Sequence, residues 1–93
     1  MANPKYTPLN GQIYKHFKGN YYVVIGHATD SDTNEIIVLY REAEPKHKPK
    51  GFIWARAVSS WFKPVDVGSG RTIPRFKLVT LTEYSEAKKA SDA

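Results

Sequence analysis

The run Ile36–Tyr40 constrains the fold more than any other part of the sequence. Its residues, Ile-Ile-Val-Leu-Tyr, are mostly β-branched or aromatic and therefore favour a strand. Side chains alternate between the two faces of a strand, so an uninterrupted apolar run is expected to be buried on both faces. We therefore predict a central strand over residues 35–42 and expect it to be the main core element.

Two strand-like segments, residues 11–17 and 21–28, precede this run. The dipeptide Gly19-Asn20 between them predicts a two-residue hairpin turn, because glycine accepts the positive φ that such a turn requires. That turn would pair Lys18 with Tyr21 and His16 with Val23. The two segments are thus expected to form a β-hairpin.

The second half predicts a fourth strand over 52–56 and a short helical turn over 58–62. Trp61 and Phe62 would plug one end of the core, and Pro64 would end the helical turn. A turn at 68–70, Gly-Ser-Gly, leads to a last strand over 73–80, which is expected at an edge because Pro74 cannot donate a ladder hydrogen bond. The segment 80–83, Thr-Leu-Thr-Glu, fits a capping box before a helix over 84–90.

A chain of 93 residues with 41% hydrophobic content is expected to form one domain. We divide it into an N-terminal extension (1–10), a small β-barrel domain (11–82) and a short helix with a frayed tail (83–93). No cysteine is present, so packing alone must stabilise the core. Five short strands with tight turns predict a mainly β fold, an SH3-like or Sm-like partly open barrel with a short C-terminal helix.

The net charge of +5 is concentrated in the second half of the chain. Residues 52–82 contain five basic and one acidic side chain, a net charge of +4, whereas the charges of residues 1–42 cancel. Such a basic half can attract phosphate, although the prolines and lysines of 45–50 are also typical of a solvated loop. No segment is typical of a secretory signal or a membrane span, so we expect a soluble, cytoplasmic protein that does not bind membranes.

Three of the four arginines lie beside aromatic residues in strand-like segments, as Tyr40-Arg41, Trp54-Ala55-Arg56 and Arg75-Phe76. An arginine in such a place is expected to be paired, stacked or available to an anionic ligand. Alternation would put Trp54 and Arg56 on one face, about 7 Å apart. The predicted ligand-binding residues are Arg56, Arg75, Trp54, Tyr40, His16 and Lys18.

The alternative is that the arginines form internal salt bridges that hold strands together. Their acidic partners would be Asp30, Asp32, Glu35 or Glu42. Because Arg41 lies in the neutral half of the chain, we expect the salt bridge there. Arg56 and Arg75 lie in the basic half, where we expect them to pair with anionic groups while Trp54 or Tyr40 stacks.

Catalytic and metal-binding patterns are weak. His16 could serve as a base for Ser31 and Asp32, but Ser31-Asp32-Thr33 is typical of an ordinary turn. The three histidines lack the spacing of a zinc site, and the glycines at 68–70 do not open a phosphate-binding helix. We expect no cofactor and no metal.

An ordered series of motifs covers about residues 11–78. It begins with Gly-Gln-Ile-Tyr-Lys-His-Phe-Lys-Gly-Asn-Tyr-Tyr at 11–22; the later motifs are Gly26, Ala28, Ser31-Asp32-Thr33, Val38-Leu39-Tyr40-Arg41, Trp54-Ala55-Arg56, Phe62, Val65 and Pro74-Arg75-Phe76. The series resembles the bacterial family of unknown function called DUF1653. The chain departs from the usual Ser-Glu-Thr at 31–33, from Trp-Val-Arg-Pro at 54–57, and in its Lys/Pro loop. The resemblance implies a small, mostly β bacterial domain with no established activity.

The sequence thus favours a non-catalytic binding module for nucleic acid or another phosphate-bearing ligand. A second hypothesis is a protein-interaction or homo-oligomeric assembly module that uses an open sheet edge or an apolar patch near Trp61 and Phe62. A small hydrolase using His16 and the 31–33 turn is the third.

Overall fold

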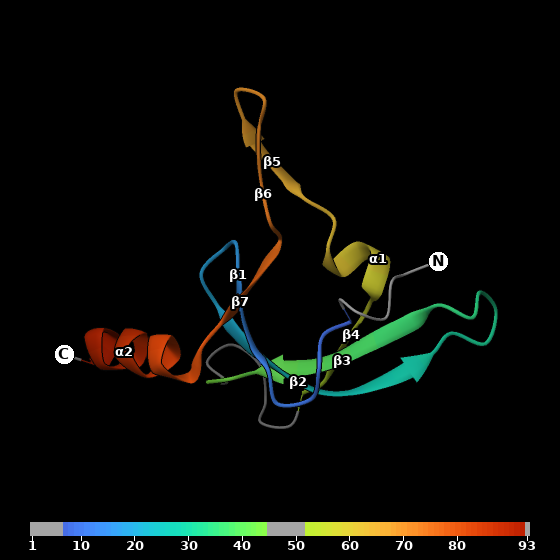
Figure 1. Ribbon diagram of the computed structural model, residues 1–93, viewed down its shortest axis with the longest axis horizontal. Coiled ribbons are helices and arrows are strands. Elements are labelled where there is room, and N and C mark those ends of the chain that lie inside the picture. The colour runs from blue at the N-terminus through green and yellow to red at the C-terminus, as the bar shows by residue number, and fades with distance from the viewer. Residues whose placement is uncertain (1–6, 45–51, 93) are drawn as a thin grey trace.

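The computed structural model describes residues 7–44 and 52–92, with side chains described up to residue 89. Figure 1 shows seven strands and two helices in this part of the chain. In chain order they are β1 (Ile13–His16), β2 (Tyr21–Thr29), β3 (Ile36–Glu42), β4 (Trp54–Ala57), α1 (Val58–Trp61), β5 (Val65–Gly68), β6 (Arg71–Ile73), β7 (Phe76–Val79) and α2 (Leu81–Asp92). The Lys/Pro loop predicted over 45–50 lies outside the described residues.

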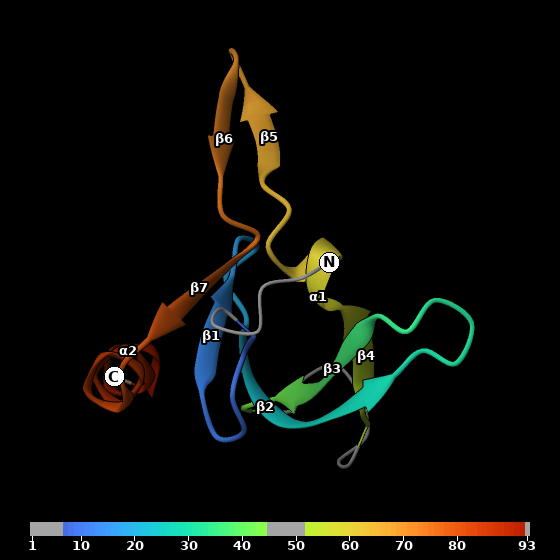
Figure 2. The same ribbon diagram turned by 45° about the vertical axis from the view of Figure 1, so that its right-hand side comes forward.

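Five strands form one antiparallel sheet in the order β4-β3-β2-β1-β7. The sheet curls into a half-barrel, as both ribbon views show (Figures 1 and 2). A β-bulge between Val24 and Gly26 interrupts the β2–β3 register, and bulges of this kind increase the local bend and twist of a strand. The mainly β fold with a short C-terminal helix is therefore confirmed.

The core lies on the inner side of the half-barrel. Val38 and Tyr40 of β3 are buried there, which confirms this run as a core element. Trp61 of α1 is fully buried and stacks on Phe76, with 3.8 Å between ring centroids, so the predicted plug by Trp61 is confirmed. Phe62, which directly follows α1, is instead 45% exposed, so the prediction that it plugs the core is wrong.

The β1–β2 turn differs from the prediction. Its loop has three residues, Phe17 to Gly19, closed by a hydrogen bond of 2.8 Å from the His16 N–H to the Asn20 carbonyl oxygen. Gly19, with φ +108°, completes this loop as the left-handed residue. The strands therefore pair Tyr14 with Tyr22, and the predicted pairing of His16 with Val23 is wrong.

Burial explains the observed register. Tyr14 of β1 and Val24 of β2 are both buried, and in this register the even-numbered residues of both strands face the core. The predicted register would pair even-numbered with odd-numbered residues and turn one strand's apolar side chains outward. As a result, His16 lies on the same inner face as Tyr14 and Tyr22.

The single strand predicted over 73–80 is divided into β6 and β7 at Pro74. β6 pairs with β5, a strand that the sequence analysis did not predict, and the two form a hairpin separate from the main sheet. The predicted hairpin turn lies at its tip, where Ser69 and Gly70 both have positive φ. Figure 2 shows the hairpin projecting away from the half-barrel.

Helix α2 follows β7 and begins at the predicted capping box. The Thr80 N–H donates to Glu83 Oε1 (2.9 Å), and the Glu83 N–H donates to Thr80 Oγ1 (3.0 Å). Tyr84 connects the helix to the sheet, since its ring lies 5.3 Å from that of Tyr21. Neither described helix has the length and apolar content that a membrane crossing requires.

Candidate functional site

Three separate elements bring basic side chains to one place. His16 ends β1, and Lys18 lies in the β1–β2 turn that follows it. Arg56 lies in β4, and Arg75 directly precedes β7. The turn meets the start of β7 through a 3.0 Å hydrogen bond from the Phe17 N–H to the Arg75 carbonyl oxygen. Both ribbon views show the β1–β2 turn beside the base of the β5–β6 hairpin. We call Lys18, Arg56 and Arg75 around His16 the cation cluster.

The His16 imidazole is at the centre of the cluster. Burial lowers its pKa below the ordinary value of 6.5, and the positive charges of Arg56, Arg75 and Lys18 lower the pKa further. Its Nδ1 accepts a hydrogen bond of 3.2 Å from the Lys18 backbone N–H. The ring is therefore neutral at pH 7, and the proton must be on Nε2 for Nδ1 to act as acceptor.

Arg56 is held on the inner face of the sheet by neutral partners. Its Nε donates to Tyr40 Oη (3.4 Å) and its Nη1 donates to Ser60 Oγ (2.9 Å). Its Cζ lies 5.8 Å from the centre of the Phe76 ring. The guanidinium is thus oriented by two hydroxyl groups and an aromatic ring, and its charge is not neutralised by them.

Arg75 is held differently, through Phe17. Its Cζ lies 5.9 Å from the centre of the Phe17 ring, and Lys18 Nζ lies at the same distance from that ring. The Nε atom of Arg75 is buried, and no hydrogen-bond acceptor for it exists in the described part of the chain. A buried donor without an acceptor is destabilising, so this N–H adds an energetic cost to the placement of Arg75.

Two of the four acidic residues proposed as arginine partners have other contacts. Asp30 Oδ1 accepts from the Asp32 N–H (2.8 Å) and the Thr33 N–H (3.3 Å), and Glu35 Oε1 accepts from the Ser59 N–H (3.3 Å). Over residues 7–44 and 52–89, no carboxylate lies within ion-pair distance of Arg56 or Arg75. The positive charge of the cluster is therefore uncompensated.

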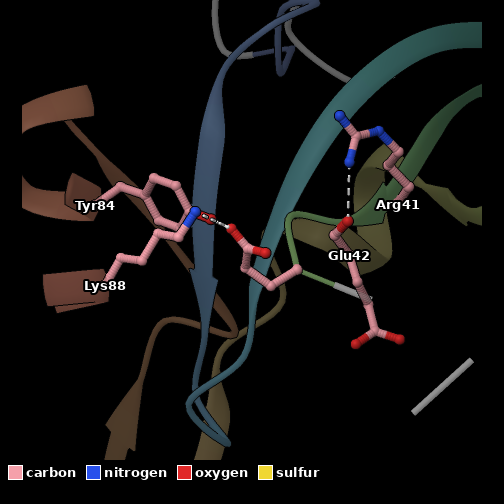
Figure 3. A network of polar contacts seen from close by, with 5 residues as sticks. Arg41, Glu42, Tyr84 and Lys88 are labelled. Carbon is pink, nitrogen blue, oxygen red and sulfur yellow. Dashed lines mark hydrogen bonds and ion pairs between the residues drawn. The ribbon is translucent and has the colours of Figure 1, made fainter. Parts of the chain in front are cut away.

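The internal salt bridge predicted for Arg41 is not formed either. Arg41 Nη1 donates instead to the backbone carbonyl oxygen of Glu42 at 3.0 Å (Figure 3). Arg41 alternates with the buried Tyr40 along β3, so its exposed side chain points to the outer face, away from the core. Arg41 and Arg56 therefore lie on opposite faces of the sheet, a difference that charge balance along the chain did not predict.

The two aromatic residues predicted to stack on a ligand are part of the scaffold. Tyr40 is only 5% exposed and packs edge-to-face on Trp61 with 5.0 Å between ring centroids. Trp54 pairs with Tyr40 across the β3–β4 register and packs against the core, half-buried. As alternation predicted, Trp54 and Arg56 share the inner face, but Tyr40 contributes its hydroxyl group to Arg56 and not an open ring face.

Two residues of the site were missed in the sequence. Phe17 lies in the β1–β2 turn, with its ring 4.5 Å from that of His16 and beneath Arg75. Ser60 lies in α1 and fixes Arg56. Phe17 was assigned to a strand, which hid its role, and Ser60 carried no signal because its contact depends on the turn from β4 into α1.

The comparisons with known proteins agree with this architecture. The sequence model of the family described as "Protein of unknown function (DUF1653)" matches residues 12–78. The chain belongs to the DUF1653 family. A crystal structure of a DUF1653 protein from Bordetella bronchiseptica is similar to it, with 30% sequence identity and a TM-score of 0.60, over 76% of this chain and 87% of that one. No curated protein matches the sequence.

In this DUF1653 chain the catalytic group of the hydrolase hypothesis, His16 with Ser31 and Asp32, is not assembled. Ser31 follows the far end of β2, and a nine-residue strand spans about 30 Å. The 31–33 segment forms a turn that Asp30 closes, as the ordinary reading of those residues predicted. Figure 1 shows this turn on the opposite side of the sheet from α2 and remote from the β1–β2 turn.

Proposed function

We propose that this DUF1653 protein is a non-catalytic binding module for a phosphate-bearing ligand, with nucleic acid among the candidates. The observation that supports it is the convergence of Lys18, Arg56 and Arg75 on a neutral His16 without a neighbouring carboxylate. Like charges gathered in this way repel one another, a cost that the binding of an anion would offset. A cytoplasmic, bacterial setting belongs to the same proposal and is supported by the absence of cysteine and by the bacterial source of the solved relative.

The chemistry of the cluster fits phosphate. Guanidinium groups bind phosphate oxygens through parallel N–H bonds, and Arg56 and Arg75 are both only partly buried. The buried rings of Trp61 and Phe76 lie beneath the cluster and exclude water from one side, which strengthens charge-assisted hydrogen bonds. Binding requires only these groups, whereas turnover would also require a nucleophile beside His16. The described contacts of that ring are aromatic rings and the Lys18 backbone N–H.

The test is a fluorescence-anisotropy titration of 5′-phosphorylated single-stranded RNA and DNA at two salt concentrations. We expect binding that weakens with salt and that falls about tenfold or more in Arg56→Gln and Arg75→Gln, because each substitution removes a charge-assisted hydrogen bond. Arg41→Gln is the matched control, since it removes the same charge from the outer face. No salt-sensitive binding at micromolar protein, or an equal loss in Arg41→Gln, overturns the proposal.

Assembly with a second copy or a protein partner is the other candidate function. It is supported by the outer edges of β4 and β7, which have no strand partner among the described residues. Leu78 on β7 is 51% exposed at such an edge. The apolar patch predicted near Trp61 is reduced to Phe62, because Trp61 is buried. Light scattering that gives only the monomer mass across the micromolar range, together with an empty pull-down, counts against assembly.

A further inference from the structure

We propose that the group recognised by the cation cluster is a terminal phosphate monoester, and not the diester backbone of a nucleic acid. This inference rests on the proposed function and narrows it to one ligand class: small phosphomonoesters, or chains that end in a phosphate. It follows from three features of the site: how its charges are distributed, which donors it offers, and how its aromatic rings are used.

Three of the ten basic residues in the described part of the chain converge on one point. The described residues carry ten basic and nine acidic side chains, so they account for a net charge of only +1 of the total +5; the other four basic residues are Lys5, Lys46, Lys48 and Lys50. A protein that follows a diester backbone presents a stripe of cations, because successive phosphates lie along the strand. Here the His16 ring lies 4.5 Å from the Phe17 ring, which Lys18 and Arg75 contact, and 5.0 Å from the Phe76 ring, which Arg56 contacts. That arrangement suits one compact anion.

The donors match a monoester in number and charge. A monoester has three terminal oxygens and a charge between −1.5 and −2 near pH 7, whereas a diester has two such oxygens and a charge of about −1. Arg75 is only partly buried and offers the accessible part of its guanidinium, and His16 offers a neutral Nε2–H. Lys18 adds an ammonium group over the Phe17 ring, which Arg75 also contacts. Three cations then face a dianion, and each terminal oxygen can accept from a different residue.

The aromatic rings are unsuited to stacking bases. Single-stranded nucleic acids are gripped by exposed ring faces on which successive bases stack. In the cluster, Trp61 and Phe76 stack on each other and are buried, and Tyr40 is packed between them and Tyr22. Phe17 is only partly buried, but its ring is in contact with His16 and Arg75. The rings therefore form a floor beneath the cations, and affinity must come from the phosphate itself.

The test compares one fluorescent oligonucleotide with and without a 5′-phosphate, supported by adenosine 5′-monophosphate as a monoester probe and a dinucleoside monophosphate as a diester probe in NMR titrations. We expect the terminal phosphate to raise affinity about tenfold or more. Adenosine 5′-monophosphate should shift the His16 and Arg75 signals, while the diester should leave them unchanged. Arg75→Gln should remove the difference between the two oligonucleotides, and Arg41→Gln should preserve it.

The outcomes separate this inference from the proposed function. Equal binding of both oligonucleotides that still depends on Arg56 and Arg75 overturns the monoester assignment and leaves a phosphate-binding module. No binding of either oligonucleotide or of either small probe overturns both. A preference for the phosphorylated oligonucleotide that survives in Arg75→Gln also overturns the assignment, because the phosphate would then be bound elsewhere.

Discussion

The cation cluster and the contacts of helix α2 use charge in opposite ways. At α2, Glu44 Oε1 lies 2.8 Å from Lys88 Nζ and accepts from Tyr84 Oη at 2.9 Å, so each charge has a partner (Figure 3). We call Glu44, Tyr84 and Lys88 the paired network. In the cation cluster, Arg56 and Arg75 have only neutral partners in the described chain.

This difference indicates which region is scaffold and which is site. The paired network satisfies its own charges at the surface, where Lys88 and Glu44 are 50% and 43% exposed, and it attaches α2 to the sheet. The cation cluster packs on the hydrophobic core, and its arginines have no carboxylate partner in the described chain, as the proposed phosphate site requires. Substitutions in the two regions should therefore affect the free energy of unfolding differently. Removal of a charge should lower it in the paired network and raise it at Arg75 of the cation cluster.

The largest effect is expected at the floor of the cation cluster. Trp61→Ala should lower the free energy of unfolding by about 3–5 kcal/mol, because it leaves a cavity beneath Phe76 and Tyr40. Urea denaturation followed by circular dichroism measures the loss, with the exposed Phe62→Ala as the control. A loss no greater than that of Phe62→Ala would show that the floor does not support the cluster.

Arg75→Met should have a smaller effect of the opposite sign. The substitution keeps an unbranched apolar chain near Phe17 while it removes a buried unsatisfied N–H and one of three like charges. We expect the free energy of unfolding to rise by about 0.5–1 kcal/mol in the absence of ligand. Arg41→Met is the control and should give no gain, since Arg41 donates to a carbonyl oxygen. A loss of stability in Arg75→Met would assign Arg75 to the scaffold.

Most of the half-barrel could be predicted from the sequence because its signals are local. The β3 run and the Thr80–Glu83 capping box depend only on neighbouring residues, and both appear where expected. The β1–β2 register could not be predicted in this way. Gly19 has the positive φ that was expected of it, but the length of the loop was decided by burial of Tyr14 and Val24, which depends on distant strands.

The site was predicted in part for the same reason. Residue type and charge selected Arg56 and Arg75, but they could not show that Tyr40 would be buried by Trp61. The predicted salt bridge of Arg41 failed because charge balance along the chain does not report which face of a strand a residue occupies. Contacts between distant elements, such as that of Arg56 with Ser60, leave no pattern in the sequence.

A pH series provides a third test, with a smaller expected effect because the His16 ring is only partly buried. The pKa of His16 is lower in the folded protein than its ordinary 6.5, so the unfolded chain binds the proton more readily. The stability that the neutral ring contributes is present above pH 6.5 and is lost as the pH falls through the lowered pKa.

His16→Phe is the matched variant, since it keeps an aromatic ring and removes the titration. In urea titrations, the free energy of unfolding of the parent should fall relative to that of His16→Phe as the pH is lowered from 7 to 5. Carboxylates that titrate in both proteins cancel in this comparison. A constant difference would mean that His16 does not experience the positive charges around it.

The smallest effect is expected in the paired network. Lys88→Met should lower the free energy of unfolding by less than about 1 kcal/mol, because a surface ion pair is screened and gains little over hydration of its separate charges. A double-mutant cycle with Glu44→Gln at low and high salt measures the coupling, which should decrease with salt. Coupling well above 1 kcal/mol that persists at high salt would mean that the paired network contributes more to the fold than an exposed ion pair does. Both regions would then contribute substantially to the free energy of unfolding. The paired network and the cation cluster would differ only in ligand binding.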